Sequence, residues 1–195
     1  GKGINNPSAI LRLSVSPQKG LSGMILSDRK TVFIEPYTSD LKTYISFINS
    51  DEDGPREPFV CETEYQPERY NISDEEYNAL RNANDGTLRT YRLALACTVE
   101  YAQFHGGTVA GALAAMNTTM TRVNGVFERD LGLTMVIVSN NQDVIFIGSD
   151  VNSDPYTNNN GGAMLNQNQT TCDGNIGSLN YDIGHVFSTG GGGIA

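Results

Sequence analysis

The 195-residue sequence has no tryptophan, only two histidines and only three cysteines. The small numbers of histidines and cysteines each exclude a kind of site. His105 and His185 stand far apart in the chain, which excludes a self-contained metal site built from several histidines. Cys61, Cys97 and Cys172 are an odd number at wide spacing, which is neither a zinc-ribbon pattern nor a dense disulfide framework. At most one disulfide can form.

Basic residues are also scarce, with 13 Lys and Arg against 22 Asp and Glu, for a net charge of −9. No basic cluster is present that could offset phosphate charge, which argues against nucleic-acid binding as the function. No apolar run approaches the roughly 18–20 residues that a membrane-spanning helix needs. With 38% hydrophobic residues, the composition is that of a globular protein.

The two ends of the sequence are unusual for a natural domain. Gly1-Lys2-Gly3 is not followed by the charged and then apolar leader of a secretion signal, and the chain stops just after the glycines at 190–193. We therefore expect both ends to be cut from a longer chain, with any secretion signal outside it.

The sequence divides into three parts. Short apolar runs at 10–15, 24–26, 31–34 and 44–48, separated by turn residues, predict an antiparallel β-meander. Acidic and polar residues then dominate, and Ser73 with Glu76 forms a capping box that predicts a short helix over 73–81. We expect a β-rich region at 1–60, an acidic linker at 61–86 and a second domain at 87–195.

The second domain is predicted to be a sheet covered by helices. Strands are expected at 89–100, 132–139, 143–148 and 182–189, and the run at 133–138 is apolar on both faces, which is typical of a central strand. Thr108 can cap a long helix to about Arg129, and a second helix is expected at 163–176. The fold class is therefore α+β: a β-meander or sandwich-like N-terminal region, followed by a mixed sheet packed on helices.

Two loops offer candidate chemistry. Asp150, Asn152 and Asp154 resemble the opening of a calcium loop, but Pro155 replaces the required glycine and Gly161 the required glutamate. A polar loop with an Asx turn is the better interpretation. The glycines at 190–193 could cradle an anion through their N–H groups, although no phosphate-binding motif follows a strand here, and an ordinary loop is favoured.

Cys97 and Cys172 are the only pair considered for a disulfide. Cys97 points with Leu93, Leu95 and Val99, and Cys172 is placed on a helix expected to cover the same sheet. The alternative is two buried free thiols that behave as small hydrophobic side chains.

From Leu88 onward the sequence resembles the first half of a reprolysin-type (adamalysin-like) metzincin catalytic domain, most closely the secreted bacterial members. The stretches that carry the resemblance are residues 88–96, 101–107, 120–130, 154–159 and 180–193. The resemblance implies a zincin-like mixed sheet and a secreted zinc endopeptidase in which the metal activates the water that attacks the peptide bond.

One departure from the family bears on activity. Such enzymes carry HExxHxxGxxH, and this sequence contains no His-Glu pair at all. In the family that motif follows the glycine-rich stretch. We therefore expect the end of a propeptide and the front of a catalytic domain, inactive alone, with zinc bound only by the full-length enzyme. The missing C-terminal part of its own catalytic domain would then be a partner.

The resemblance also implies site residues. Members of the family align a protein or peptide substrate along the strand before the active-site helix, and the corresponding residues here are Gly184, His185, Val186, Phe187, Ser188 and Thr189. In several metzincin precursors a propeptide thiolate binds the catalytic zinc, and Cys61 is the candidate for that latency ligand. The residues around Cys61 do not match the family's cysteine-switch pattern closely, and an inert buried thiol in a strand is the favoured alternative. The alternative function is a non-catalytic secreted binding or adhesion module. The next ~60 residues of the reading frame, the length that would complete a single domain, would separate the two hypotheses.

Overall fold

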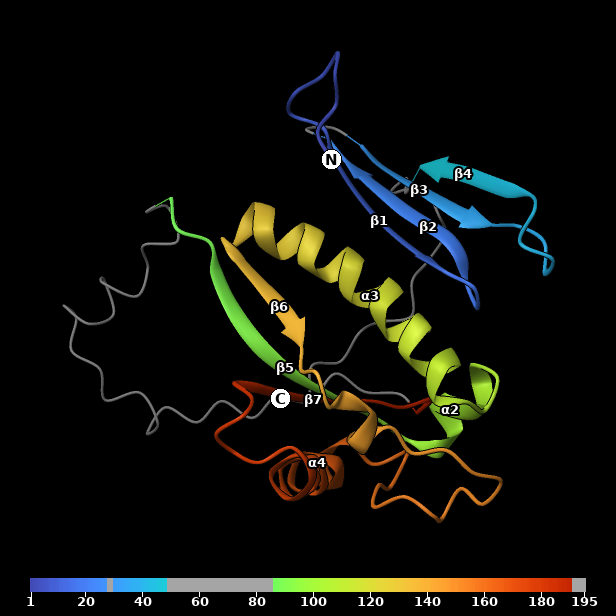
Figure 1. Cartoon of the computed structure of the whole chain (residues 1–195), viewed down its shortest axis with the longest axis vertical. Helices are drawn as coiled ribbons and strands as arrows, with labels where there is room; N and C mark the ends of the chain where they lie inside the picture. The colour runs from blue at the N-terminus through green and yellow to red at the C-terminus, as the bar shows by residue number, and fades with distance from the viewer. Residues whose placement is uncertain (28–29, 49–85, 191–195) are drawn as a thin grey trace.

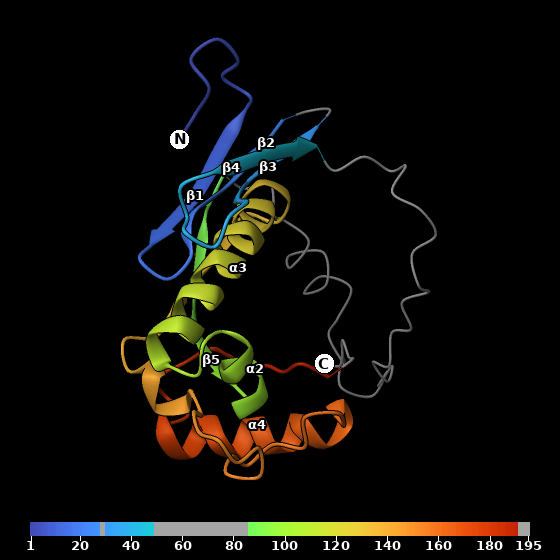
Figure 2. The same ribbon diagram turned by 90° about the vertical axis from the view of Figure 1, so that its right-hand side faces the viewer.

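A computed structural model of the chain describes residues 1–27, 30–48 and 86–190. Its elements form stacked layers: an N-terminal sheet, the long helix α3 (Val109–Asp130), a second sheet and the helix α4 (Gly161–Asn175) (Figures 1 and 2). The helix predicted at 73–81, Cys61 and all but the last residue of the linker predicted at 61–86 lie outside the described residues.

The N-terminal sheet is the predicted meander. Its strands β1 (Ile10–Ser16), β2 (Gly20–Leu26), β3 (Thr31–Pro36) and β4 (Tyr44–Ile48) lie in chain order, and each pair is antiparallel. The first turn needs Gly20, whose φ of 64° is costly for residues with a side chain. Arg12, opposite Met24, lies on the sheet face toward α3, whereas Leu13, opposite Gly23, lies on the outer face.

The second sheet has the strand order β6-β5-β7, with β5 (Arg89–Cys97) paired in parallel to both β6 (Leu133–Ile137) and β7 (Ile183–Phe187). Two expectations differ from this arrangement. The described strands are all parallel rather than mixed, and the two-sided apolar run at 133–138 is not the central strand. The central strand is β5, because its small side chains Ala94 and Ala96 let α4 approach one face while Leu93 and Leu95 fill the other.

The strand predicted at 143–148 is absent. The chain there forms a short 3₁₀ helix, η2 (Asn141–Val144), followed by a single bridge from Ile145 to Cys97. The reason is Asn141, whose side chain accepts from Leu95 N at 2.7 Å and donates to Leu95 O at 2.8 Å. One buried amide therefore satisfies the β5 backbone where a neighbouring strand was expected.

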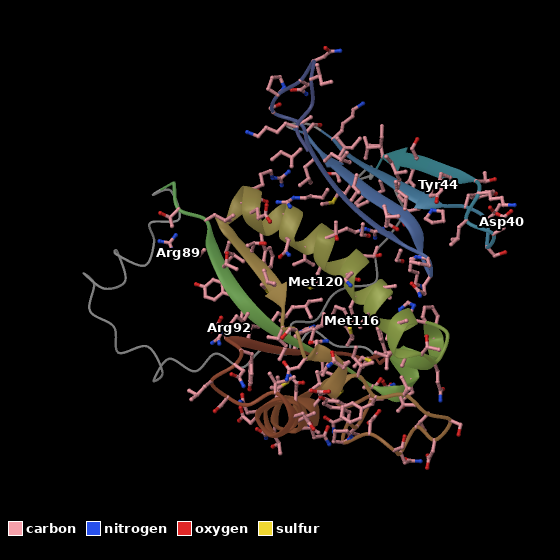
Figure 3. The ribbon with its side chains drawn as sticks, in the orientation of Figure 1. Asp40, Tyr44, Arg89, Arg92, Met116 and Met120 are labelled. Carbon is pink, nitrogen blue, oxygen red and sulfur yellow. The ribbon has the colours of Figure 1, made fainter. Side chains whose placement is uncertain are left out.

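The helices begin where side-chain caps allow. Thr108 accepts from Gly111 N and starts α3 as predicted. Thr98 caps a short helix, α2 (Val99–Phe104), and β5 therefore ends earlier than the predicted strand at 89–100. The alternation of apolar residues did not indicate this helix. Met116 and Met120 lie on the side of α3 that packs against the second sheet (Figure 3). Among the helices of the described residues, none is both long and apolar enough to cross a bilayer.

Candidate functional site

β7 contains most of the residues that the resemblance singled out for substrate binding. Thr98 N donates to Phe187 O at 3.0 Å, so the backbone groups of Phe187 point toward β5. Since these groups alternate along a strand, the N–H and C=O of Gly184 and Val186 point away from β5. In the described part of the chain no strand pairs with that outer edge. Backbone donors and acceptors there can form hydrogen bonds with an extended peptide.

The beginning of β7 is fixed by an ion pair. The Arg92 guanidinium and backbone N–H donate to the Asp182 carboxylate at 2.7–3.1 Å, and the guanidinium also reaches Leu179 O. The Arg92 hydrogen bonds lower the pKa of Asp182 to about 2, so this carboxylate stays ionised at physiological pH. Arg92, on β5, thereby sets where β7 starts (Figure 3).

The end of β7 is fixed by a single asparagine. Asn158 Oδ1 accepts from Thr98 Oγ1 and from Thr189 N, and Asn158 Nδ2 donates to Thr189 Oγ1 at 3.0 Å. The next residue, Gly190, runs so close that an added Cβ would overlap the Asn158 carbonyl. The first glycine of the terminal run is therefore a packing requirement at this point, and Ser188 and Thr189 lie beyond the strand, in the turn that Asn158 holds.

The side chains of β7 divide between the two faces of the sheet. Ile183 and Phe187 pack into the core under α3, whereas Val186 packs into the core under α4. His185 is exposed at the edge, and its ring lies 5.3 Å from that of Phe187. Gly184, where an added Cβ would come 3.6 Å from Cys172 Sγ, brings α4 close to the edge.

The predicted calcium residues do not converge. Asp150 Oδ1 accepts from Asn152 N and Nδ2, which is the Asx turn favoured from sequence. Asp154 is instead directed at the first turn of α2 and at its own loop, accepting from Val99 N at 2.6 Å and from Tyr156 N at 2.8 Å. Backbone N–H groups therefore use the oxygens that a cation would need, and we do not retain the calcium site.

Of the two alternatives for Cys97 and Cys172, the structure shows two buried free thiols, which lie on opposite faces of the second sheet. Cys97 belongs to the core under α3 and Cys172 to the core under α4. Burial raises the pKa of Cys97 to about 12 and that of Cys172 to about 11, so both stay protonated and unreactive.

The residues that the structure describes do not fit a zinc centre. Nδ1 of His105 lies 3.0 Å from the Lys19 ammonium, which repels a cation, and His185 is on the β7 edge beside an aromatic ring. Across residues 1–27, 30–48 and 86–190 no group of three or more His, Cys, Asp or Glu side chains could hold a metal ion. Cys61, the candidate latency ligand, lies outside the described residues.

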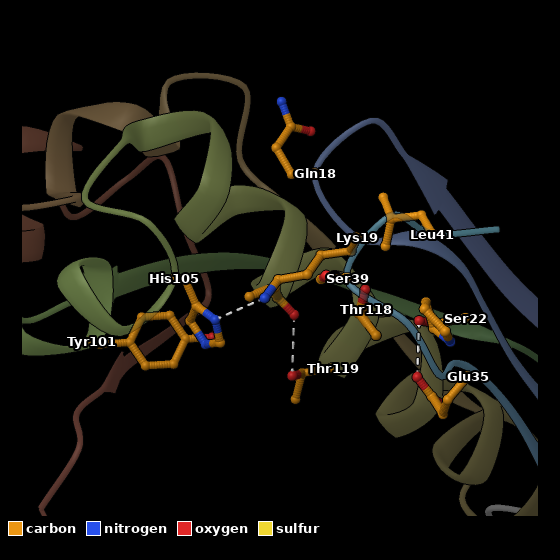
Figure 4. A pocket seen from close by; sticks show the side chains of 12 residues that line it. Gln18, Lys19, Ser22, Glu35, Ser39, Leu41, Tyr101, His105, Thr118 and Thr119 are labelled. Carbon is orange, nitrogen blue, oxygen red and sulfur yellow. Dashed lines mark hydrogen bonds between the residues drawn. The ribbon is translucent and has the colours of Figure 1, made fainter. Parts of the chain in front are cut away.

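A polar pocket of about 470 Å³ lies between the N-terminal sheet and the helices α2 and α3 (Figure 4). Lys19, His105, Thr118 and Glu35 line it, and Ser22 Oγ donates to Glu35 at 3.1 Å. Sequence reasoning missed this junction, and it also missed the roles of Asn141 and Asn158. Their only sequence signal is a polar side chain beside an apolar run, which many loop residues share.

The comparisons with known proteins give one match. The family model of reprolysin-like metallopeptidases, family M12B, matches residues 87–193. No curated protein and no solved structure matches the chain. The family match spans more than half of the 195 residues and includes β5, α3, β6, α4 and β7. The chain belongs to the reprolysin-like metallopeptidases of family M12B.

Proposed function

We propose that the chain is part of the precursor of a secreted, zinc-dependent metalloendopeptidase that hydrolyses peptide bonds in proteins or peptides. The family match over residues 87–193 carries this proposal. In it, residues from 87 onward are the front of a metzincin-type catalytic domain, and the N-terminal sheet belongs to the propeptide.

The 195 residues alone are not catalytically competent in this proposal. Their sequence lacks HExxHxxGxxH, and the described histidines do not fit a zinc centre. The metal ligands would be supplied by residues that follow in the family's order, so the remainder of the catalytic domain is the first partner expected.

The direct test uses the longer reading frame. We expect HExxHxxGxxH within about one domain length after Ala195, and a purified product that binds one zinc per chain and cleaves unstructured peptides. The 195-residue chain, and the long product with the motif glutamate changed to glutamine, serve as inactive controls. A reading frame without the motif would overturn the proposal and leave a non-catalytic binding or adhesion module.

We further propose that the outer edge at Gly184–Thr189 aligns the substrate. Val186→Pro in the long product removes an outward N–H without touching the hydrogen bonds to β5, since proline is tolerated at an edge strand. Val186→Thr keeps that N–H at almost the same volume. We expect kcat/KM to fall about tenfold in the proline variant and to stay near wild type in the threonine variant. Equal kinetics in both folded variants would remove this edge from substrate binding.

Latency through Cys61 is the last element of the proposal. In the long precursor, Cys61→Ala would then give activity before processing, because a thiolate ligand that blocks the zinc would be gone. Unchanged latency in that variant would exclude Cys61 from the mechanism.

A further inference from the structure

The helix α3 has a second face, which lies against the N-terminal sheet (Figures 1 and 2). Met116 and Met120 face the second sheet, whereas Thr118, Arg122 and Glu128 contact the N-terminal sheet. We call the residues Thr118, Arg122, Gly125 and Glu128 the outer face of α3.

Two crossed ion pairs join the outer face to the N-terminal sheet. Arg12 of β1 pairs with Glu128, and Arg122 pairs with Glu35 of β3. Each side thus supplies one arginine and one glutamate, so a single relative orientation satisfies both pairs. The Arg122 guanidinium also lies 5.5 Å from the centroid of the Phe33 ring, within the range of a cation–π contact.

A glycine in the middle of α3 makes room for the sheet. An added Cβ at Gly125 would come within 2.8 Å of Met24 Cε and 3.0 Å of Arg12 Cγ. Glycine inside a helix costs about 1 kcal/mol relative to alanine. The cost is explained if this position serves the contact with β1 and β2, because a side chain there would have to displace the side chains of Met24 and Arg12, and a large one would not fit against the sheet.

The N-terminal sheet and the second domain also carry net charges of opposite sign. Residues 1–27 and 30–48 contain five Lys and Arg against two Asp and Glu, whereas residues 86–190 contain four against eight. The overall charge of −9 conceals this difference. The opposite sign belongs to these ranges alone, because residues 1–53, the piece released in the test below, hold six Lys and Arg against six Asp and Glu. The attraction between the cut pieces therefore comes from the ion pairs rather than from net charge.

We infer that the outer face of α3 is a docking surface for the N-terminal sheet, residues 1–48, and that the sheet stays bound there after the covalent connection to the second domain is cut. Only the identification of the N-terminal sheet as part of a propeptide rests on the proposed function. If that identification holds, the propeptide remains bound to the catalytic domain after it has been cut. The docking surface is on α3 and the proposed substrate edge is on β7. We therefore do not propose that the N-terminal sheet competes with substrate for that edge.

The test uses the full 195-residue chain with the recognition sequence of a site-specific protease inserted between Asp53 and Gly54. After complete cleavage, we expect the two pieces to co-elute in size-exclusion chromatography at 0.15 M salt, where the Debye length is about 8 Å. Separation of two folded pieces at that salt concentration would overturn the inference.

Charge reversal makes the test specific to the outer face. Arg122→Glu and Glu35→Arg should each weaken the binding of the cut pieces at least tenfold, and the double variant should restore much of it. Arg129→Glu is the matched control, because Arg129 is on the same helix but pairs with its neighbour Asp130. Equal binding in all variants would contradict the docking surface.

A steric variant guards against charge changes that only unfold the chain. Gly125→Leu raises helix propensity but fills the space that Gly125 leaves for Met24 and Arg12. We therefore expect α3 to keep its helical circular dichroism while the cut pieces separate. Co-elution of the Gly125→Leu pieces would contradict the inference. The chromatography measures binding and not peptidase activity. A failure of docking and a failure of the proposed function are therefore detected by separate experiments.

Discussion

Lys19 Nζ lies 3.0 Å from Nδ1 of His105, so the turn between β1 and β2 is hydrogen-bonded to the residue that caps the C-terminal end of α2. The ammonium group can only donate, so the imidazole accepts at Nδ1 and is neutral. Burial, and then the Lys19 charge, lower the pKa of His105. The neutral imidazole is therefore the form that fits between the N-terminal sheet and α2.

Docking of the N-terminal sheet should weaken in acid. When the sheet leaves, His105 returns toward its ordinary pKa of 6.5, so the undocked state takes up the proton first as the pH falls. The loss should begin near pH 6.5, grow until the lowered pKa of the docked state and then level off. Above pH 7 this group should have no effect.

The measurement is the fraction of cut chain that co-elutes at pH 7.5, 6.5 and 5.5. His105→Gln, whose amide oxygen can still accept from Lys19, should show a smaller decrease than wild type. His185→Gln, on the β7 edge, should keep the wild-type dependence. A His105→Gln variant as sensitive to pH as wild type would assign the effect to the carboxylates of the crossed ion pairs.

Asn141→Ala should destabilise the second domain by about 3 kcal/mol. Its removal leaves the N–H and C=O of Leu95 without partners in a fully buried strand, and each unpaired buried group costs roughly 1–3 kcal/mol. Urea unfolding followed by circular dichroism measures the change. Asn152→Ala, on an exposed loop, should cost less than about 0.5 kcal/mol. Similar losses in both variants would contradict the role of Asn141 as a substitute for a strand.

Asn158→Ala should loosen the end of β7 without unfolding the domain. The side chain supplies both contacts of Thr189 and one of Thr98, so the loss of all three frees residues 188–190. Hydrogen exchange should show faster exchange of the Thr189 amide and unchanged protection of the β5 amides. Thr157→Ala, in the same loop but bonded to Gln167, is the control. Unchanged exchange at Thr189 would show that Asn158 is dispensable.

The thiols of Cys97 and Cys172 should react only after unfolding. With Cys61 changed to serine, the native chain at pH 8 should give no rapid reaction with a thiol reagent, because burial raises the pKa of both remaining thiols to 11 or above. In denaturant without reductant the same variant should give two thiols. A count of zero there would restore the disulfide that the structure excludes.

The local elements were readable from sequence. The meander, the start of α3 at Thr108 and the alternation along β5 follow from short-range periodicity and from capping, which depend on residues a few positions apart. The family could be recognised for the same reason, since its stretches from Leu88 onward are local patterns confirmed by the match over 87–193.

Long-range placement was decided only by the tertiary structure. Periodicity could show that Cys97 and Cys172 are buried, but not that the sheet lies between them. It could not show that Asn141 replaces a strand beside Leu95, or that Gly125 admits the N-terminal sheet. These features join residues far apart in the chain, and a side chain's partner across such a distance is set by how whole layers pack rather than by its neighbours in sequence.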